Sequence, residues 1–335
     1  MTLNIAINGF GRIGRMIFRA LADSQHTDMK IVAINDLADD ATLAHLLKYD
    51  SIHGRFNADV STKDGVMLVN GERVHMSAER DPADLPWAEL DIDIVMECTG
   101  FFRSTETAGK HLQAGAKRVL ISAPAQGDIP TIVYGINHDT LTVDDHIVSN
   151  ASCTTNALAP LAYILHKAYG LKRGMMTTIH AYTGDQPTHD SVHKDLYRGR
   201  AAALSMIPTT TGAAKAIGKV LPELNGLLDG VSIRVPTANV SAVDLTIETE
   251  RPATEDEIRD LFKTAANGSL KGILAYTDEK LVSSDFNHDP HSTTFLGDQI
   301  YVNDGTMIRV MSWYDNEWGF SNRMLDTARE IGKFL

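Results

Sequence analysis

The chain has 335 residues, of which 43% are hydrophobic and 22% are charged, and its formal net charge is −12 at pH 7. That length allows two domains of ordinary size in a globular protein, and no apolar run is long enough to span a bilayer. The acidic charge excludes nucleic acid and anionic membrane as main partners, and two cysteines cannot form a disulfide framework, so we expect the cytoplasm.

A glycine-rich motif follows the first predicted strand. Residues 3–8 alternate in hydrophobicity and lead into a G-x-G-x-x-G sequence at Gly9, Gly11 and Gly14, after which apolar residues recur at helical spacing. The glycines allow a tight turn and the close approach of a pyrophosphate to helix N–H groups. A bare motif of this kind is often a plain turn, but its place between a strand and a helix predicts a dinucleotide site.

An acidic residue completes this pattern. Residues 31–36 form a second apolar strand that ends in Asp36, 22 residues beyond Gly14. The Asp36 carboxylate can accept a hydrogen bond from a ribose 2′-hydroxyl and would repel a 2′-phosphate, so it favours NAD over NADP. Arg12, inside the motif, is either a solvated surface charge or a phosphate partner, and we favour the phosphate partner.

Strands and helices continue to alternate through the first half. A helix is expected at residues 105–114, and further strands at residues 91–98, 118–122, 131–135 and 146–148. This repeat predicts an α/β fold with a doubly wound parallel sheet of the Rossmann type. Ligands of such sheets bind at the carboxyl ends of the strands, where the sequence places Asp36, Thr99, Ser122 and Cys153.

A cysteine opens the next predicted helix. Asn150 and Ser152 are good N-cap residues before Cys153, the residues that follow are rich in Leu, Ala and Ile, and Gly170 ends the pattern. A thiol in a first helical turn faces unpaired N–H groups, which we expect to lower its pKa from about 8.5 and make it a nucleophile. The alternative is a small core residue, which is what the apolar strand around Cys98 indicates for that cysteine.

The second half has a different pattern. Alternating strands with few helices between them are expected at residues 175–182, 231–235, 243–247 and 308–314. They predict an α+β domain with a mostly antiparallel or mixed sheet. A capping box at residues 254–257 opens one helix, and a helical stripe at residues 321–335 predicts a tail helix that docks on a core. The long polar stretch at residues 181–207 is typical of a functional or interfacial loop.

Three polar features of the second half are candidates for chemistry. His180, 27 residues after Cys153, is either a packed strand residue or the imidazole that a reactive thiol requires as acid and base. Arg234 is either an edge charge or an anion ligand. Residues 209–212, before a helical segment, are either an ordinary N-cap or a phosphate site.

Four segments carry a family resemblance: residues 8–15, 151–156, 209–216 and 313–319. Through them the sequence resembles the phosphorylating glyceraldehyde-3-phosphate dehydrogenase family nearly end to end. The resemblance implies that Cys153 attacks the aldehyde of glyceraldehyde 3-phosphate, that His180 handles the proton, and that hydride transfer to NAD leaves a thioester. Inorganic phosphate would then release 1,3-bisphosphoglycerate.

The resemblance also implies roles for further residues. Besides the three motif glycines, the cofactor residues would be Arg12, Ile13, Asp36, Arg80, Ser122 and Asn316. Thr183 and Arg234 would hold the substrate phosphate. The attacking phosphate would bind at Ser152, Thr154, Arg198, Thr211 and Gly212. No residue is assigned to a metal.

The same resemblance implies an organisation. Residues 1–150, with a C-terminal helix at residues 319–335, would form the NAD-binding domain, and residues 151–318 the catalytic domain. The family is usually a homotetramer, with residues 181–207 near the subunit core. Ser191 stands where NAD-specific members often have Leu, and it could tolerate a 2′-phosphate better than Leu would. Because Asp36 would still repel that phosphate, we expect a preference for NAD with some residual use of NADP.

Three alternatives differ from this interpretation. Residues 44–50 and 286–291 look like erythrose-4-phosphate dehydrogenase, but residues 180–186 and 211–215, beside the phosphates, resemble the glyceraldehyde enzyme and carry more weight. A non-catalytic NAD-binding interaction protein would be expected to lose Cys153, His180 or Arg234, and all three are present. A cysteine hydrolase would not need the glycine motif with Asp36. We therefore predict an NAD-dependent dehydrogenase.

Overall fold

The computed structural model describes residues 2–24 and 27–335. Three residues of the predicted NAD-binding domain, Met1, Gln25 and His26, lie outside the described residues. The chain separates into two compact units. The first comprises Met1–Tyr134, His138–Ala151 and Ser321–Leu335, and the second Gly135–Asn137 and Ser152–Phe320.

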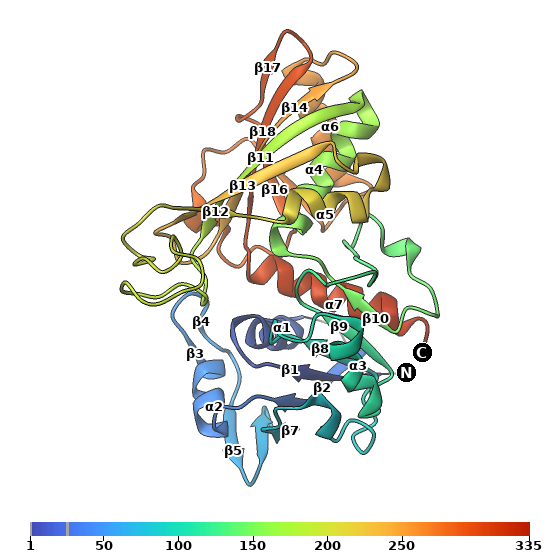
Figure 1. Ribbon diagram of the computed structural model, residues 1–335, viewed down its shortest axis with the longest axis vertical. Helices are drawn as coiled ribbons and strands as arrows, with labels where there is room; N and C mark the ends of the chain where they lie inside the picture. Colours follow the sequence, from blue (N-terminus) through green and yellow to red (C-terminus); the bar gives the residue numbers. More distant parts are fainter. Residues whose placement is uncertain (1, 25–26) are drawn as a thin grey trace. The chain divides into compact units, whose positions relative to one another are not determined.

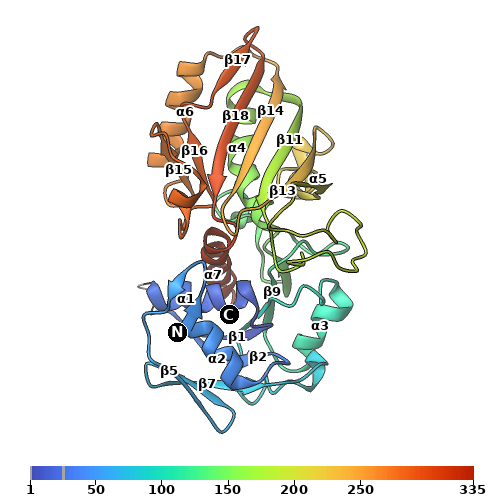
Figure 2. The same cartoon turned by 90° about the vertical axis from the view of Figure 1, so that its left-hand side faces the viewer.

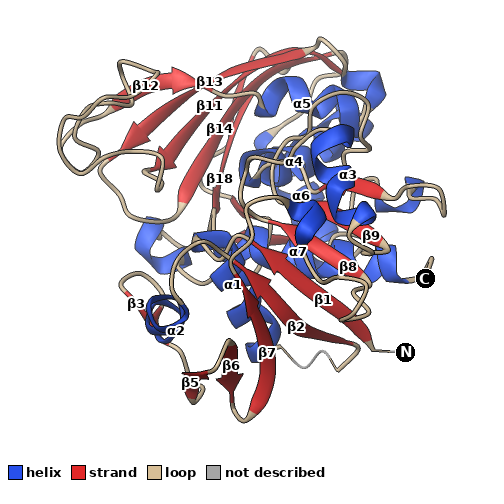
Figure 3. Ribbon diagram, turned by 60° about the horizontal axis from the view of Figure 1, so that its bottom comes forward, coloured by secondary structure: helices blue, strands red, loops and turns tan. Residues whose placement is uncertain are grey.

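A largely parallel sheet organises the first unit (Figures 1 and 3). Its strands lie in the order β10 (Ile147–Ser149), β9 (Arg118–Ile121), β8 (Ile94–Glu97), β1 (Leu3–Asn8), β2 (Met29–Asn35), β7 (Glu72–Ser77), β6 (Val66–Val69) and β5 (Val60–Lys63). Every pair from β10 to β7 is parallel, which confirms the predicted doubly wound sheet. The antiparallel edge formed by β5, β6 and β7 was not predicted.

One predicted strand of this unit is wrong. Instead of a strand at residues 131–135, Thr131 forms an isolated parallel bridge with Ser149. The chain then turns at residues 134–137, where Gly135 has a φ of 87°, in the left-handed region that strands do not use, so a strand cannot extend to residue 135.

Helices α1 (Arg12–Asp23), α2 (Asp40–Lys48), α3 (Thr105–Gln113) and the tail helix α7 (Trp318–Gly332) accompany this sheet. Short elements lie between them: β3 (Tyr49–Asp50), β4 (Gly54–Arg55), η1 (Pro82–Asp84) and η2 (His138–Thr140). The predicted stripe of the tail helix is buried at Met324, Ala328 and Ile331. Leu335 was expected to share it, but it is 41% exposed because the helix ends before it.

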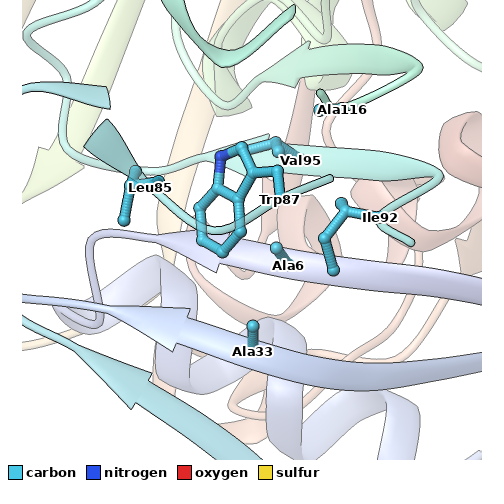
Figure 4. Packing of buried hydrophobic residues seen from close by; sticks show 7 residues of the cluster. All are labelled: Ala6, Ala33, Leu85, Trp87, Ile92, Val95 and Ala116. Atoms are coloured by element: carbon cyan, nitrogen blue, oxygen red, sulfur yellow. The ribbon is translucent and has the colours of Figure 1, made fainter. Parts of the chain in front are cut away.

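The core of the first unit includes a cluster around Trp87, whose side chain is fully buried (Figure 4). Ala6 of β1 pairs in register with Ala33 of β2 on one side and with Val95 of β8 on the other. Small side chains at these neighbouring positions leave room for the indole ring, which Leu85 and the other members of the cluster also contact. Emptying such a site by Trp→Ala substitution typically costs about 3–5 kcal/mol.

A mixed sheet organises the second unit, as predicted (Figure 2). Its strands lie in the order β12 (Ile207–Thr210), β13 (Leu228–Val235), β11 (Leu171–Ala181), β14 (Ser241–Thr249), β18 (Met307–Tyr314), β16 (Thr293–Leu296) and β15 (Leu274–Thr277), and β17 (Tyr301–Asn303) pairs with β18. The pairs β11–β13 and β15–β16 are parallel, and the other pairs are antiparallel.

Helices α4 (Cys153–Tyr169), α5 (Ala213–Val220) and α6 (Glu255–Asn267) cover one face of this sheet, and η3 (Pro222–Leu224) and η4 (Ser283–Phe286) lie in its connections. The predicted capping box of α6 is present, with Thr254 and Glu257 exchanging hydrogen bonds. On the opposite face, Met175, Val231 and Met307 are exposed apolar side chains. Within the described residues, no helix combines the length and the apolar character that crossing a membrane requires.

Candidate active site

The first unit holds a cavity of about 510 Å³ at the carboxyl ends of its parallel strands. It is lined by Asn8, Gly9, Gly11, Asn35, Asp36, Leu37, Glu79, Arg80, Cys98, Thr99, Phe101 and Phe102. Four of the predicted cofactor residues, Gly9, Gly11, Asp36 and Arg80, therefore meet in one place. Arg12, Ile13, Gly14 and Ser122 are not among its lining residues.

The geometry of the glycine loop suits a dinucleotide. Gly9 has a φ of 92°, and a Cβ at Gly14 would lie 2.3 Å from the Gly9 carbonyl oxygen, so neither position accepts a side chain. Nothing lies within 4 Å of a Cβ placed at Gly11, which leaves open space for a ligand beside the backbone. Asp36 closes the loop, because its Oδ2 accepts the Phe10 N–H at 2.7 Å. These residues fit the pyrophosphate and ribose of a dinucleotide.

Arg12 has a partner that neither sequence alternative included. It forms an ion pair with Asp50, with Nη1–Oδ2 at 2.7 Å. Burial opposes ionisation of Asp50, but hydrogen bonds from Arg12 and from the N–H groups of His53 and Ile52 lower the pKa of that carboxyl to about 2. A phosphate at Arg12 would therefore have to compete with an ionised carboxylate.

Cys98 does not lie in the core as predicted. It follows the last residue of β8, is half-buried, and borders the cavity, with Ser122 as a hydrogen-bond partner of its thiol. Burial raises the pKa of the Cys98 thiol far above its ordinary value, which keeps it protonated. A strand that ends one residue earlier than the apolar run indicates explains the difference.

In the second unit, Cys153 is the first residue of α4, and its sulfur lies 3.6 Å from His180 Nε2. The Ser152 side chain caps the helix by accepting the Thr155 N–H at 3.1 Å, and Gly170 ends it, as predicted. His180 is the penultimate residue of β11. Its Nδ1 donates to the Ala181 carbonyl at 2.6 Å, so the nitrogen that faces the thiol is a proton acceptor.

The electrostatics of this pair differ from the expectation. Burial raises the pKa of the Cys153 thiol, and the opposing effects of the Arg234 charge and of nearby hydrogen bonds do not outweigh it. The N–H groups of the helix terminus do lower the pKa, but the predicted net lowering is wrong, because burial outweighs them. Burial, with the positive charges of Arg234 and Arg198, lowers the pKa of His180 to about 3. The resting pair is a neutral thiol beside a neutral imidazole whose Nε2 lone pair faces the sulfur.

Arg234 lies in register with His180 across the parallel strands β11 and β13. Its Nη1 donates to the Thr183 hydroxyl at 3.1 Å and to the Ala181 carbonyl at 3.2 Å. Its Nε has no hydrogen-bond partner within the described part of the chain. The structure thus places Thr183 and Arg234 together, and leaves the guanidinium with donor capacity for an anion.

A second basic residue lies on the loop between β11 and β12. Arg198 Nε donates to the Thr209 hydroxyl at 3.0 Å, and its Nη1 pairs with Asp185 at 3.0 Å. Thr211 and Gly212 lie between the end of β12 and the start of α5, and the Thr211 hydroxyl accepts the Ala213 N–H there. Arg198 also contributes to the field at Arg234.

Two residues that sequence reasoning missed join these groups. The Tyr314 hydroxyl lies between Thr154 and Thr178, at 2.8 and 2.9 Å from their hydroxyl oxygens, and its ring packs edge-on against His180. Tyr314 stands in a segment of the family resemblance, which could have singled it out.

Ser241 is the other missed residue. It accepts the Ala181 N–H at 3.1 Å and donates to Asn316 Oδ1 at 2.7 Å, which leaves the Asn316 NH₂ group as the donor of that amide. No sequence pattern distinguishes Ser241. Val240, just before it, has a φ of 68°, which is strained for a β-branched residue, and Ala151 has a φ of 58° two residues before Cys153.

A cavity lined by the glycine loop and Asp36 on a doubly wound sheet, and a cysteine paired with a histidine on a second unit, are typical of the class of nicotinamide-dependent dehydrogenases. Residues 3–105 match the family model described as glyceraldehyde 3-phosphate dehydrogenase, NAD binding domain, and residues 152–316 match that of the C-terminal domain. The chain belongs to the glyceraldehyde 3-phosphate dehydrogenase family.

Relatives of this family match the chain along its full length. The sequence is 61% identical over 335 residues to glyceraldehyde-3-phosphate dehydrogenase of Cereibacter sphaeroides, with 100% of both chains covered. It is 58% identical over 333 residues to the protein of that name from Xanthobacter flavus, with 99% of both chains covered. It is 54% identical over 332 residues to the one from Geobacillus stearothermophilus, with 99% of this chain and 98% of the relative covered.

Proposed function

We propose that the protein catalyses the NAD-dependent oxidative phosphorylation of D-glyceraldehyde 3-phosphate to 1,3-bisphosphoglycerate. The observation that carries the proposal is the 3.6 Å approach of Cys153 Sγ to His180 Nε2, with Arg234 in register beside the histidine. This arrangement joins a thiol nucleophile, its base and an anion ligand, which are the groups that a phosphorylated aldehyde requires.

The first step uses the neutral pair. His180 Nε2 takes the proton of Cys153 as the sulfur forms a bond to the aldehyde carbon, and it then passes that proton to the carbonyl oxygen, which becomes the hydroxyl of a hemithioacetal. The Nδ1 hydrogen bond to the Ala181 carbonyl holds the imidazole in the tautomer that this transfer needs. N–H groups of the first turn of α4 are available to stabilise charge on the oxygen.

His180 then removes the hydroxyl proton of the hemithioacetal. Bound NAD would supply the hydride acceptor for the same carbon, and loss of that hydride would leave a thioester on Cys153. Gly9, Gly11, Asp36 and Arg80 would hold the cofactor in the cavity of the first unit. Asn316 of the second unit stays assigned to the nicotinamide amide by resemblance, with its NH₂ group as the free donor of the side chain. Gly14 shapes the loop. Arg12, Ile13 and Ser122 stay assigned to the cofactor by resemblance.

Phosphate enters at two places. Thr183 and Arg234 would hold the phosphate of the substrate, because their hydrogen bond sets the guanidinium beside the reacting pair. Inorganic phosphate would attack the thioester carbon from a second site and release the Cys153 sulfur. The residues proposed for that site are Ser152, Thr154, Arg198, Thr211 and Gly212.

The domain roles, assembly and compartment are part of the proposal. Residues 1–150, with the helix at residues 319–335, would bind NAD, and residues 151–318 would carry the reaction. A homotetramer would cover exposed apolar side chains such as Met175 and Val231 on the outer sheet face and Leu204 on the long loop. Light scattering should give a mass near four times the 36.6 kDa chain. Both cysteines are free thiols, which suits the cytoplasm.

The test follows NADH absorbance with purified protein and NAD. It compares glyceraldehyde 3-phosphate with erythrose 4-phosphate, with and without inorganic phosphate, and includes Cys153→Ser. We expect turnover on the triose that depends on phosphate and is abolished by the substitution. Preference for the tetrose would make the protein an erythrose-4-phosphate dehydrogenase. No NADH from either sugar, with NAD still bound, would leave a non-catalytic NAD-binding protein.

A further inference from the structure

A fully buried carboxylate lies beneath the cofactor cavity and has no part in the mechanism above. Glu97, the last residue of β8, has no exposed surface. Its Oε1 accepts both the backbone N–H, at 2.8 Å, and the hydroxyl of Thr99. Its Oε2 accepts Asn8 Nδ2 at 2.6 Å and bonds His111 Nε2 at 3.0 Å. Burying a carboxylate is costly unless donors surround it, as they do here.

The direction of these hydrogen bonds is determined from the core outward. Trp87 Nε1, which can only donate, lies 3.0 Å from His111 Nδ1, so that nitrogen carries the lone pair. His111 must then hold its proton on Nε2 and donate it to Glu97. Each partner of Glu97 is thus a donor, and the chain of bonds runs one way from the Trp87 cluster to the carboxylate.

The network continues across the strands that form the cavity. Asn8 Oδ1 at the end of β1 accepts Asn35 Nδ2 from the end of β2 at 2.7 Å. Asn35 in turn accepts the Glu79 N–H at 2.8 Å and donates to the Glu79 carbonyl at 2.9 Å, just before Arg80. The carboxyl ends of β8, β1 and β2 and the loop after β7 are adjacent in the sheet. One connected set of hydrogen bonds therefore joins the three strand ends and the loop after β7.

We propose that Glu97 is a positioning residue for the dinucleotide. Its carboxylate accepts hydrogen bonds from Thr99, Asn8 and His111, and these bonds hold the cavity in the shape that binds the ligand. Thr99, Asn8, Asn35 and Glu79 all line that cavity, whereas Glu97 and His111 do not reach it. The inference rests on the proposed function, because it takes NAD as the ligand. Its consequence is that Glu97 controls cofactor affinity and leaves the chemistry on Cys153 unchanged.

The test is Glu97→Gln in the full-length protein. The substitution keeps the shape of the side chain but replaces one acceptor oxygen by an NH₂ group that faces other donors. The strand ends therefore lose hydrogen bonds to a shared acceptor. We expect the Kd for NAD and the KM for NAD to rise by about tenfold or more, with kcat at saturating NAD within about twofold of the wild type. The matched control is Asp93→Asn.

Asp93 is a buried carboxylate at the other end of the same strands, where it accepts the Asn4 N–H at 2.7 Å and pairs with Lys117 at 2.7 Å. We expect its substitution to lower stability without changing NAD affinity. Equal losses of NAD affinity in Asp93→Asn and Glu97→Gln would mean general loosening and would overturn the inference, as would unchanged affinity in Glu97→Gln.

A second variant tests the direction of the hydrogen bonds. With Trp87→Phe, His111 loses the donor at Nδ1 and can place its proton there, so Nε2 becomes free to accept from a glutamine at position 97. We expect the double variant to bind NAD more tightly than Glu97→Gln alone, although Trp87→Phe by itself gives no gain. Additive or worse losses would contradict the assigned direction. If wild-type protein does not bind NAD, the proposed function fails; if only the variants behave otherwise, the inference fails.

Discussion

The cofactor cavity of the first unit and the thiol site of the second unit are built in opposite ways. At the cavity and directly behind its lining, polar groups are paired with one another: Asp36 accepts the Phe10 N–H, and the buried Glu97 accepts from Thr99, Asn8 and His111. In the thiol site, burial keeps Cys153 and His180 neutral, and Arg234 keeps a donor without a partner in the described residues.

This difference follows from what each site does. A binding site gains affinity when its shape is already formed, because binding then carries no free-energy cost for ordering the protein. A catalytic site must change its charges during the reaction, so groups that are incompletely paired at rest become paired in the transition state. Substitutions should therefore alter affinity at the first site and rate at the second.

The largest expected effect is on the base. His180→Asn removes the proton acceptor that lies 3.6 Å from the thiol, and we expect kcat to fall by about 10²–10⁴-fold. The Kd for NAD, measured by fluorescence titration, should stay within about twofold of the wild type. A matching loss of NAD affinity would show that the two sites do not separate as we describe.

The anion ligand should have the next largest effect. Arg234→Leu removes charge-assisted hydrogen bonds to the substrate phosphate, typically about 1.5–3 kcal/mol, or roughly 10- to 150-fold in kcat/KM for the triose phosphate. Glyceraldehyde without its phosphate should be affected far less. Arg234→Lys serves as the control that keeps the charge but loses the planar fork. An equal loss with both aldehydes would remove Arg234 from the substrate phosphate.

A smaller effect is expected at the cofactor cavity. Asp36→Asn removes the charge that would repel a 2′-phosphate, so the ratio of kcat/KM for NAD to that for NADP should fall by about tenfold. Wild-type protein should prefer NAD and retain some NADP use. A wild-type preference for NADP would contradict the role given to Asp36, whose carboxylate also accepts the Phe10 N–H.

The smallest effect concerns the two thiols. Because burial raises the pKa of Cys153, its alkylation by iodoacetamide should keep rising beyond about pH 8.5, where an ordinary thiol is half ionised. Cys98 should react more slowly at every pH, since burial raises its pKa as well and the Glu97 carboxylate adds to the effect. Peptide mapping by mass spectrometry measures both. A plateau for Cys153 below pH 7 would show that the thiolate forms early.

Local patterns in the sequence predicted the elements that short-range physics controls. The strand–glycine–helix segment that begins at Leu3, the N-cap at Ser152 and the capping box at Thr254 are all present, because each depends on backbone geometry and hydrogen bonds within a few residues. Alternating hydrophobicity predicted β11, β13, β14 and β18, because successive side chains of a strand point to opposite faces of the sheet. The strand expected at residues 131–135 was wrong, and the edge hairpin of β5 and β6 was missed.

By itself the sequence determined the two kinds of sheet and the dinucleotide motif, and through the family resemblance it predicted Cys153 as the nucleophile and His180 as its base. Only the tertiary structure decided which groups meet. The partner of Arg12, the place of Ser241 between Ala181 and Asn316, and the path from Trp87 to Glu97 all depend on hydrogen bonds between residues that are 14 to 75 positions apart in the sequence. The same is true of the thiol pKa, because burial is a property of the packed chain, and it outweighed the local effect of the helix terminus.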